Sequence, residues 1–215
     1  MAKKSVNKVT IVGCGPGSRK YLTGYAIHQI SNAEVLIGSR RLLALFPEAD
    51  AETYVLSNNY KLLITRIASL SKKKRVVVLV SGDPGFFSYS KLIVDKIGIE
   101  KCEVIPGISS VQLAFAKIGR TWNDACFMSL HGRSAKLAAV VKKITDNAKV
   151  AVLTDNANNV KLIAKKLLET GIKEKRIFVC ENLSLEKERI REFDVSSILK
   201  IRVSDLNVII FLDED

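Results

Sequence analysis

Continuous apolar runs alternate along the chain with longer segments whose apolar residues recur at helical spacing. The runs at 9–12, 76–80 and 102–105 contain almost no polar alternation, which is typical of strands buried on both faces of a parallel sheet. A further strand, the second along the chain, is expected at 34–37. Helices are expected at 20–31, 39–45, 59–71, 87–97 and 109–118. The first half of the chain therefore predicts a parallel α/β sheet.

One predicted helix shows its apolar face clearly. Within 59–71 the helical spacing assigns that face to Leu62, Ile64, Ile67, Ala68 and Leu70.

A second α/β region is expected from residue 126. Its predicted strands are 126–130, 149–153, 176–180, 188–192 and 207–212, and its helices are 135–145, 158–169 and 195–199. The short link at 181–187 predicts a hairpin, which makes this sheet mixed. Residues 119–124 carry polar and turn residues and are the expected linker. The sequence thus predicts an N-terminal α/β domain at 1–119 and a C-terminal α/β domain at 124–215.

Three glycine-bearing turns follow strands in the first half. Residues 13–17 read Gly-Cys-Gly-Pro-Gly, residues 81–85 read Ser-Gly-Asp-Pro-Gly, and residues 106–110 read Pro-Gly-Ile-Ser-Ser. Ligands of open α/β sheets bind just past the carboxyl ends of such strands. One of these turns alone is equally compatible with a tight connection between elements. Three turns at strand ends favour a ligand site.

Two common nucleotide sites are excluded by the residues present. Counting from Gly13, the third glycine of a dinucleotide fingerprint is replaced by Ser18, and the second strand ends in Gly38-Ser39-Arg40 without a ribose-binding acid. A phosphate-binding loop is excluded because no Gly-Lys-Ser/Thr follows any of the turns.

The composition bounds the class of protein. The 215 residues suit one large or two small domains, and the 47% apolar residues are enough for a core. No apolar run reaches the length of a membrane span, and residues 1–5 precede a strand rather than an apolar signal region, so a cytoplasmic location is expected. The four cysteines are far apart and only two histidines occur, which predicts buried thiols and no metal site.

The formal net charge of +12 has two interpretations. Solvated lysines on helix ends and loops, as at 72–75, account for much of it. The remainder favours an anionic partner, either nucleic acid or a small polycarboxylate. Because only 7% of the residues are aromatic, stacking on bases is poorly supported, and we expect the small polycarboxylate.

The three turn sequences resemble those of the tetrapyrrole methylases, and the resemblance runs nearly end to end. The segments Ile37-Gly38-Ser39-Arg40, Ser129-Leu130-His131-Gly132-Arg133 and Thr154-Asp155-Asn156 are similar to the branch that methylates C5 of cobalt-precorrin-7 in anaerobic cobalamin biosynthesis. The resemblance implies two α/β domains, a parallel N-terminal sheet and a mixed C-terminal sheet. It also implies S-adenosyl-L-methionine in the cleft between them.

The resemblance implies cofactor contacts that the residues partly support. Gly82 permits close backbone approach, and Asp83 is suited to bond the cofactor amine or ribose, although an Asp before proline also organises a turn. Ser109, with the amide of Ser110, is suited to hold the cofactor carboxylate, although without the other two turns a plain helix cap is the better explanation of this serine. Family matching places five more residues against the cofactor: Pro16, Phe86, Leu130, Thr154 and Leu183. The apolar ones among them are also suited to ordinary core packing.

The chemistry implied by the resemblance depends mainly on positioning. A meso carbon of a reduced tetrapyrrole is already nucleophilic, so the enzyme holds it in line with the methyl–sulfur bond. Asp83 and His131 are the candidate catalytic residues for proton adjustment, although a lone histidine after a strand is more often structural. Guanidinium groups near strand ends are candidates for the substrate carboxylates, or else surface arginines: Arg19, Arg40, Arg41 and Arg133.

The implied partners are a polycarboxylate tetrapyrrole, a second copy in a homodimer, and a separate enzyme of the CbiT type for C15 methylation and decarboxylation. Neither a membrane nor a nucleic acid is expected as a partner. Three alternatives remain open: another precorrin methylase, an RNA or protein methyltransferase of the same fold, and a non-catalytic ligand-binding module.

Overall fold

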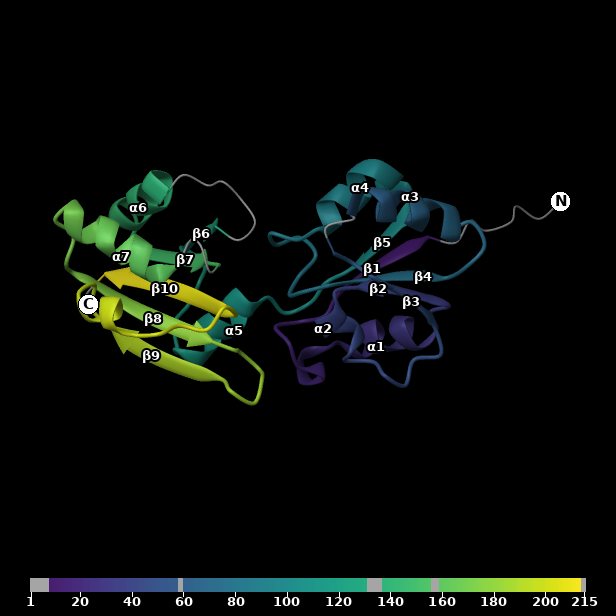
Figure 1. Cartoon of the computed structure of the whole chain (residues 1–215), viewed down its shortest axis with the longest axis horizontal. Helices are drawn as coiled ribbons and strands as arrows, with labels where there is room; N and C mark the ends of the chain where they lie inside the picture. Colours follow the sequence, from purple (N-terminus) through teal and green to yellow (C-terminus); the bar gives the residue numbers. More distant parts are fainter. Residues whose placement is uncertain (1–7, 58–59, 131–136, 156–158, 214–215) are drawn as a thin grey trace. The chain divides into compact units, whose positions relative to one another are not determined.

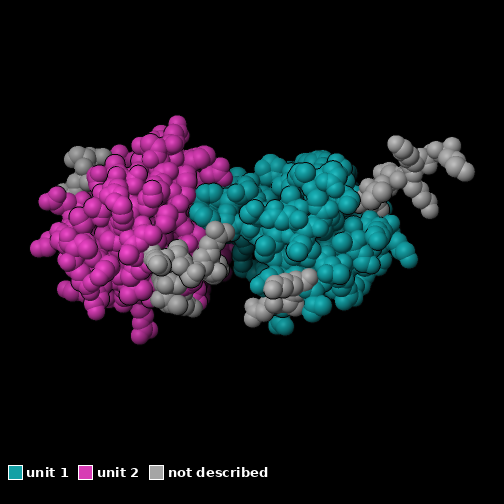
Figure 2. Space-filling model, turned by 90° about the horizontal axis from the view of Figure 1, so that it is seen from above, with its two compact units in different colours: residues 1–109 teal, residues 110–215 magenta. Residues whose placement is uncertain are grey.

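The computed structural model describes residues 8–57, 60–130, 137–155 and 159–213. The chain divides into two compact units, Met1–Ser109 and Ser110–Asp215 (Figure 1, Figure 2). The division falls ahead of the segment 119–124, so helix α5 (Ser110–Lys117) counts with the second unit. Within the described ranges no helix is long and apolar enough to cross a membrane.

The first unit contains the predicted parallel sheet. Its five strands lie in the order β3-β2-β4-β1-β5, and every neighbouring pair is parallel. The bounds are β1 Val9–Gly13, β2 Val35–Gly38, β3 Glu52–Val55, β4 Val76–Val80 and β5 Cys102–Ile105.

Both faces of this sheet are covered, which explains why its strands are continuously apolar. In β4, Val76, Val78 and Val80 belong to one core cluster, and Val77 and Leu79 belong to another. Helices α3 (Tyr60–Leu70) and α4 (Ser90–Ile97) line the first cluster. Helices α1 (Gly24–Ser31) and α2 (Arg40–Leu43) line the second, so the helix pairs lie on opposite faces of the sheet (Figure 1).

Three local predictions in this unit need correction. The segment predicted as one helix at 20–31 is a 3₁₀ turn, η1 (Arg19–Tyr21), followed by α1, which Thr23 caps by accepting from the amide of Ala26. The helix predicted from residue 87 begins at Ser90, because Phe87 has a positive φ of 47° that no helix allows. Leu62 is 78% exposed, and Leu63 packs in the core instead.

The second unit contains the predicted mixed sheet. Its strand order is β6-β7-β10-β8-β9; β6 and β7 are parallel, and the other pairs are antiparallel. The expected hairpin joins β8 to β9. The bounds are β6 Cys126–Ser129, β7 Lys149–Leu153, β8 Lys175–Glu181, β9 Arg189–Phe193 and β10 Asn207–Asp213.

Helices α6 (Leu137–Asp146) and α7 (Val160–Glu169) cover one face of the second sheet and share a core cluster with its strands. The helix expected at 195–199 is a short 3₁₀ helix, η3 (Ser197–Lys200), which packs against α7. Helix α5 contacts β10. A second 3₁₀ turn, η2 (Ile99–Lys101), precedes β5 in the first unit.

Candidate functional site

The three glycine turns meet in the first unit, because β4, β1 and β5 are neighbours in the sheet. The amide of Cys14 donates to the carbonyl of Val80 at 2.8 Å, which extends the pairing beyond the strands. Gly15 and Gly82 then exchange hydrogen bonds of 3.3 and 2.8 Å across an isolated bridge. The first and second turns are thus one backbone assembly at the carboxyl ends of the strands.

Glycine is required where this assembly is tightest. A Cβ on Gly13 would lie 2.7 Å from the amide nitrogen of Gly107 and 2.7 Å from the carbonyl oxygen of Gly82. A Cβ on Gly107 would lie 2.5 Å from the carbonyl oxygens of both Gly13 and Gly82. Since the obstructing atoms belong to the backbone, no rotamer change relieves these contacts. The third turn is therefore packed directly against the other two.

Asp83 ties the second turn to the third. Its Oδ1 accepts from the amide of Gly85 at 2.7 Å, and its Oδ2 accepts from the amide of Gly107 at 3.1 Å. The turn-organising role considered for this residue is therefore present in the structure. Each oxygen keeps a second lone pair, so the carboxylate retains acceptor capacity toward a ligand.

The other expected cofactor residues of the first unit flank these turns. Pro16, Gly82 and Phe86 are half-buried, and the ring of Phe86 packs edge-on against Phe87 with centroids 4.7 Å apart. Ser109 is buried and directly precedes α5, whose first residue is Ser110.

The candidate arginines of this unit differ in their surroundings. Arg19 pairs with Glu48 and lies over the ring of Phe46, whereas Arg40 is exposed. Arg41 is half-buried and donates through Nη2 to Ser81 Oγ at 2.8 Å, at the start of the second turn. Of the three, only Arg41 contacts a residue of the glycine turns through a hydrogen bond that the structure describes.

Three expected cofactor residues lie at one edge of the second sheet. Leu130 and Thr154 follow the parallel neighbours β6 and β7, and Leu183 follows β8, the partner of β10. All three are buried. Leu183 lies between Asn182 and Ser184, both of which have the positive φ that is uncommon for residues other than glycine.

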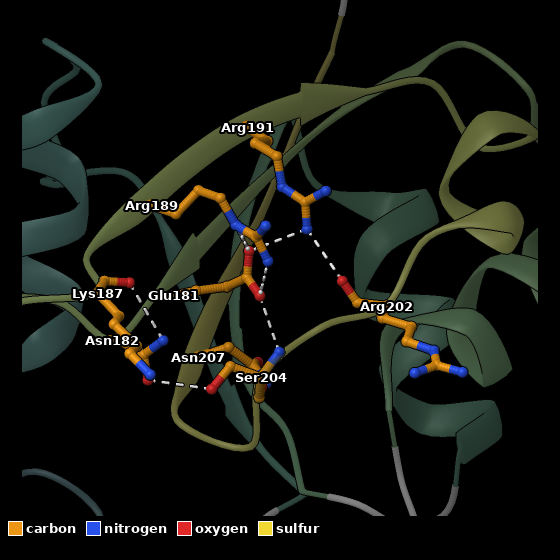
Figure 3. Close-up of polar contacts among 8 residues, drawn as sticks. All are labelled: Glu181, Asn182, Lys187, Arg189, Arg191, Arg202, Ser204 and Asn207. Atoms are coloured by element: carbon orange, nitrogen blue, oxygen red, sulfur yellow. Dashed lines mark hydrogen bonds and ion pairs between the residues drawn. The ribbon is translucent and has the colours of Figure 1, made fainter.

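A hydrogen-bond chain orients Thr154 at this edge. The side-chain amide nitrogen of Asn207 donates to the carbonyl of Ser204 at 2.7 Å, which leaves its Oδ1 to accept from Thr154 Oγ1 at 2.7 Å. Ser204 Oγ in turn bonds Asn182 Oδ1 at 3.0 Å, and Asn182 donates to the carbonyl of Lys187 at 3.2 Å (Figure 3). The chain connects Thr154 to the hairpin that carries Leu183.

Glu181 anchors this network at the end of β8. Its side chain is fully buried, and Arg189 donates to both carboxylate oxygens, at 2.9 and 3.0 Å. Arg191 donates to Oε2 at 2.9 Å and the amide of Ser204 donates to Oε1 at 2.8 Å (Figure 3). Burial works to raise the pKa of Glu181, but these hydrogen bonds outweigh it and hold the pKa below its ordinary value.

The sequence analysis did not select Glu181 or Asn207. A signal for Glu181 was present, because a buried strand ending in glutamate is followed across a short link by arginines at alternate positions, 189 and 191. Arg189 lies directly opposite Glu181 in the sheet. Two other site candidates, His131 and Arg133, lie outside the described residues.

The expectation of buried thiols is met by three of the four cysteines. Cys14, Cys102 and Cys180 are buried, whereas Cys126 is half-buried. Burial raises the pKa of Cys14 to about 12 and the pKa of Cys180 to about 12. These thiols are therefore neutral at ordinary pH.

The chain is similar to known proteins along almost its whole length. Residues 8–199 match the family model described as Tetrapyrrole (Corrin/Porphyrin) Methylases. The cobalt-precorrin-7 C(5)-methyltransferase of Salmonella typhimurium is 35% identical over 206 residues, covering 96% of this chain and 99% of the relative.

Two solved structures are similar across almost the whole chain. A cobalamin-biosynthesis precorrin-6Y methylase from Archaeoglobus fulgidus has a TM-score of 0.72 and 27% identity, covering 97% of this chain and 98% of its own. The uroporphyrin-III C-methyltransferase of Thermus thermophilus, solved with S-adenosyl homocysteine, has a TM-score of 0.77 and 24% identity, covering 96% and 92%. The match to the family model over most of the chain and the full-length relatives lead to one conclusion: this chain belongs to the tetrapyrrole methylase family.

Proposed function

We propose that this chain transfers a methyl group from S-adenosylmethionine to C5 of cobalt-precorrin-7, giving cobalt-precorrin-8, in anaerobic cobalamin biosynthesis. The observation that carries the proposal is the relative from Salmonella typhimurium, which matches along almost the full length of both chains and bears that activity in its name. The assembly of three glycine turns at adjacent strand ends supports it independently, because ligands of open α/β sheets bind there.

The residues present fit S-adenosylmethionine. The cofactor carries a carboxylate, and a buried guanidinium nitrogen of Arg41 beside the second turn has no acceptor among the described residues. The cofactor also carries an adenine, whose amino group is a donor. Because the hydroxyl proton of Thr154 is committed to Asn207, Thr154 Oγ1 presents only acceptor lone pairs, which suits such a donor.

When bound, S-adenosylmethionine supplies an electrophilic methyl group attached to a sulfonium. In the transfer, the carbon–sulfur bond breaks with its electron pair remaining on sulfur, a carbon–carbon bond forms at C5, and the corrinoid releases one proton. The chain contributes position rather than strong acid–base groups. The glycine turns fix one surface through close backbone packing and the hydrogen bonds of Asp83, and a dry site favours dispersal of the sulfonium charge.

The substrate is a polycarboxylate, and the net charge of +12 supports its capture. We further propose that the protein acts in the cytoplasm as a homodimer. C15 methylation and decarboxylation would belong to a separate enzyme. The support for the last point is that the relative of equal length is named for C5 alone.

The decisive test is incubation with S-adenosylmethionine and a series of cobalt-corrinoid intermediates under anaerobic conditions, followed by mass spectrometry. We expect cobalt-precorrin-7 to gain one methyl group and S-adenosylhomocysteine to form in equal amount, with the label located at C5 by NMR. Methylation of a different precorrin, or methylation of RNA in a parallel reaction, would replace the proposed substrate. Binding without turnover on every substrate would indicate a non-catalytic module.

A further inference from the structure

Arg41 is placed by α2 with its guanidinium against the glycine turns of the first unit. It follows β2, and its Nη2 reaches Ser81 Oγ, the first residue after β4, at 2.8 Å. Its charge is also felt by Cys14 of the first turn, where it opposes the larger effect of burial on the thiol pKa. The guanidinium is therefore beside two of the three turns.

One nitrogen of this guanidinium has no hydrogen-bond acceptor. Nη1 of Arg41 is buried and unpartnered, and no carboxylate pairs with the side chain in the part of the chain that the structure describes. Two other arginines pair with carboxylates, Arg176 with Glu192 and Arg189 with Glu181; the Nε of Arg191 is likewise buried without an acceptor, but that guanidinium is paired with Glu181. Burial without a counter-ion lowers the pKa of Arg41 from its ordinary value.

A buried charged donor without an acceptor is costly, because no hydrogen bond offsets the loss of its hydration. Native structures leave few such groups, and each one that remains requires an explanation, such as a functional role or a bound group. The missing group must be an acceptor, and the uncompensated charge favours an anion. A carboxylate oxygen satisfies both conditions, because it forms short, charge-assisted bonds with a guanidinium.

We propose that Arg41 Nη1 donates a hydrogen bond to a carboxylate of a ligand bound at the glycine turns. This inference rests on the proposed function. The carboxylate belongs to one of two ligands: it is the amino-acid carboxylate of S-adenosylmethionine or a side-chain carboxylate of the tetrapyrrole. In either case Nη2 of the guanidinium is bonded to Ser81, which leaves Nη1 to donate to the ligand.

The test compares Arg41→Met and Arg41→Lys with Arg75→Met as the matched control. Arg75 belongs to the same unit but precedes β4, at the opposite end of the strand from Ser81, and pairs there with Glu34. Calorimetry measures the Kd of S-adenosylhomocysteine and of methylthioadenosine, which lacks the amino-acid carboxylate. Fluorescence quenching measures the Kd of uroporphyrin III as a polycarboxylate probe, and steady-state kinetics give KM for cobalt-precorrin-7.

If the cofactor carboxylate is the partner, both Arg41 variants bind S-adenosylhomocysteine about 10-fold or more weakly, while methylthioadenosine binds as it does to the wild type. If the tetrapyrrole carboxylate is the partner, S-adenosylhomocysteine binding is unchanged and uroporphyrin affinity falls, with a raised KM and a nearly constant kcat. Arg75→Met alters neither. The inference is overturned if both Arg41 variants bind all three probes as the wild type does.

Stability gives a readout that separates this role from a structural one. Arg41→Met removes the exposed hydrogen bond to Ser81 but also removes an uncompensated buried charge, so Tm is expected to stay the same or rise. A Tm that falls while binding stays normal would assign Arg41 to structure and refute the inference. Arg41→Lys keeps the charge and the reach toward Ser81, so it gives the binding result if the Met variant does not fold. If the wild type binds S-adenosylhomocysteine but leaves cobalt-precorrin-7 unmethylated, the proposed function fails and the binding comparisons still test Arg41.

Discussion

The carboxylate of Asp83 accepts a hydrogen bond from the amide of Gly107, which lies 24 residues further along the chain, at 3.1 Å. Its other oxygen accepts from Gly85 within its own turn. Asp83, which is an expected ligand contact, thus also holds two turns together. Its two roles can be separated by measuring stability and binding on the same variant.

Asp83→Asn is expected to weaken both properties. The amide keeps one acceptor but directs an NH₂ group at a backbone donor, so we expect the free energy of unfolding to fall by about 1–3 kcal/mol. S-adenosylhomocysteine binding should weaken as the turns loosen. Urea denaturation and calorimetry measure the two effects. Weakened binding at full stability would instead make Asp83 a ligand contact alone. Normal binding at reduced stability would mean that Asp83 only holds the two turns together.

Gly107→Ala is expected to disrupt the first unit. The added Cβ meets two carbonyl oxygens at 2.5 Å, and because backbone must move, a loss of about 3 kcal/mol is expected. Gly24→Ala is the control, since a Cβ at this helical position has nothing within 4 Å and should stabilise by about 0.5–1 kcal/mol. Thermal unfolding distinguishes them, and equal Tm values would contradict the tight packing of the turns.

Glu181→Gln is expected to destabilise the second unit in a pH-dependent way. The folded-state pKa of Glu181 is depressed, so its contribution is present above the unfolded pKa of about 4.3 and disappears as the pH falls through the folded value. At pH 7 the free energy of unfolding should fall by about 3 kcal/mol, because two arginines lose their counter-ion. The difference in free energy of unfolding between the wild type and the variant should become smaller below about pH 4.

Glu192→Gln is the control for that experiment, because it removes a partly exposed pair with Arg176. Such pairs contribute about 0–1 kcal/mol, so little change is expected. A pH-independent deficit in Glu181→Gln would show that the carboxylate charge is not the source of its contribution.

Added salt is expected to weaken substrate affinity much more than S-adenosylhomocysteine affinity. A polycarboxylate is drawn in by the net charge, which salt screens, whereas local hydrogen bonds respond weakly. Arg40→Ala should mimic high salt in the measured KM. Neutralising Lys72 and Lys73, which are exposed ahead of β4 at the end away from the glycine turns, should leave KM nearly unchanged. Equal losses from the lysine and arginine variants would favour an RNA partner.

Calorimetry is also expected to detect S-adenosylhomocysteine binding and no NAD binding. Ser18 occupies the position of the third fingerprint glycine, and no acid follows β2. Saturable NAD binding without a response to S-adenosylhomocysteine would refute the assignment.

The sequence predicts most of the fold because burial on two faces leaves a clear signal. Strand β4 is apolar at every position, and the glycines after it can be placed without knowledge of the rest. The edge strand β3 has no such signal, because its residues are mostly exposed and it pairs on one side only. Leu62 was assigned to the wrong face for a related reason, since periodicity alone cannot separate it from Leu63.

The site is predicted only in part. Turn positions follow from strand order, so the meeting of Gly13, Gly82 and Gly107 could be anticipated. The unpaired nitrogen of Arg41 and the buried carboxylate of Glu181 depend on side chains that tertiary packing brings together. Strand register decides which arginine faces Glu181, and register between β8 and β9 cannot be read from composition.

Each unit contains a buried thiol whose alkylation can report when that unit opens. Cys14 belongs to the first unit and Cys180 to the second, and neither side chain has any exposed surface. The thiolate, not the thiol, is the nucleophile that attacks an alkylating reagent, so a buried thiol with a pKa of about 12 is protected both sterically and chemically. Labelling at either position must therefore await local or global opening of that unit, and the two labelling rates compare the opening free energies of the two halves within one molecule.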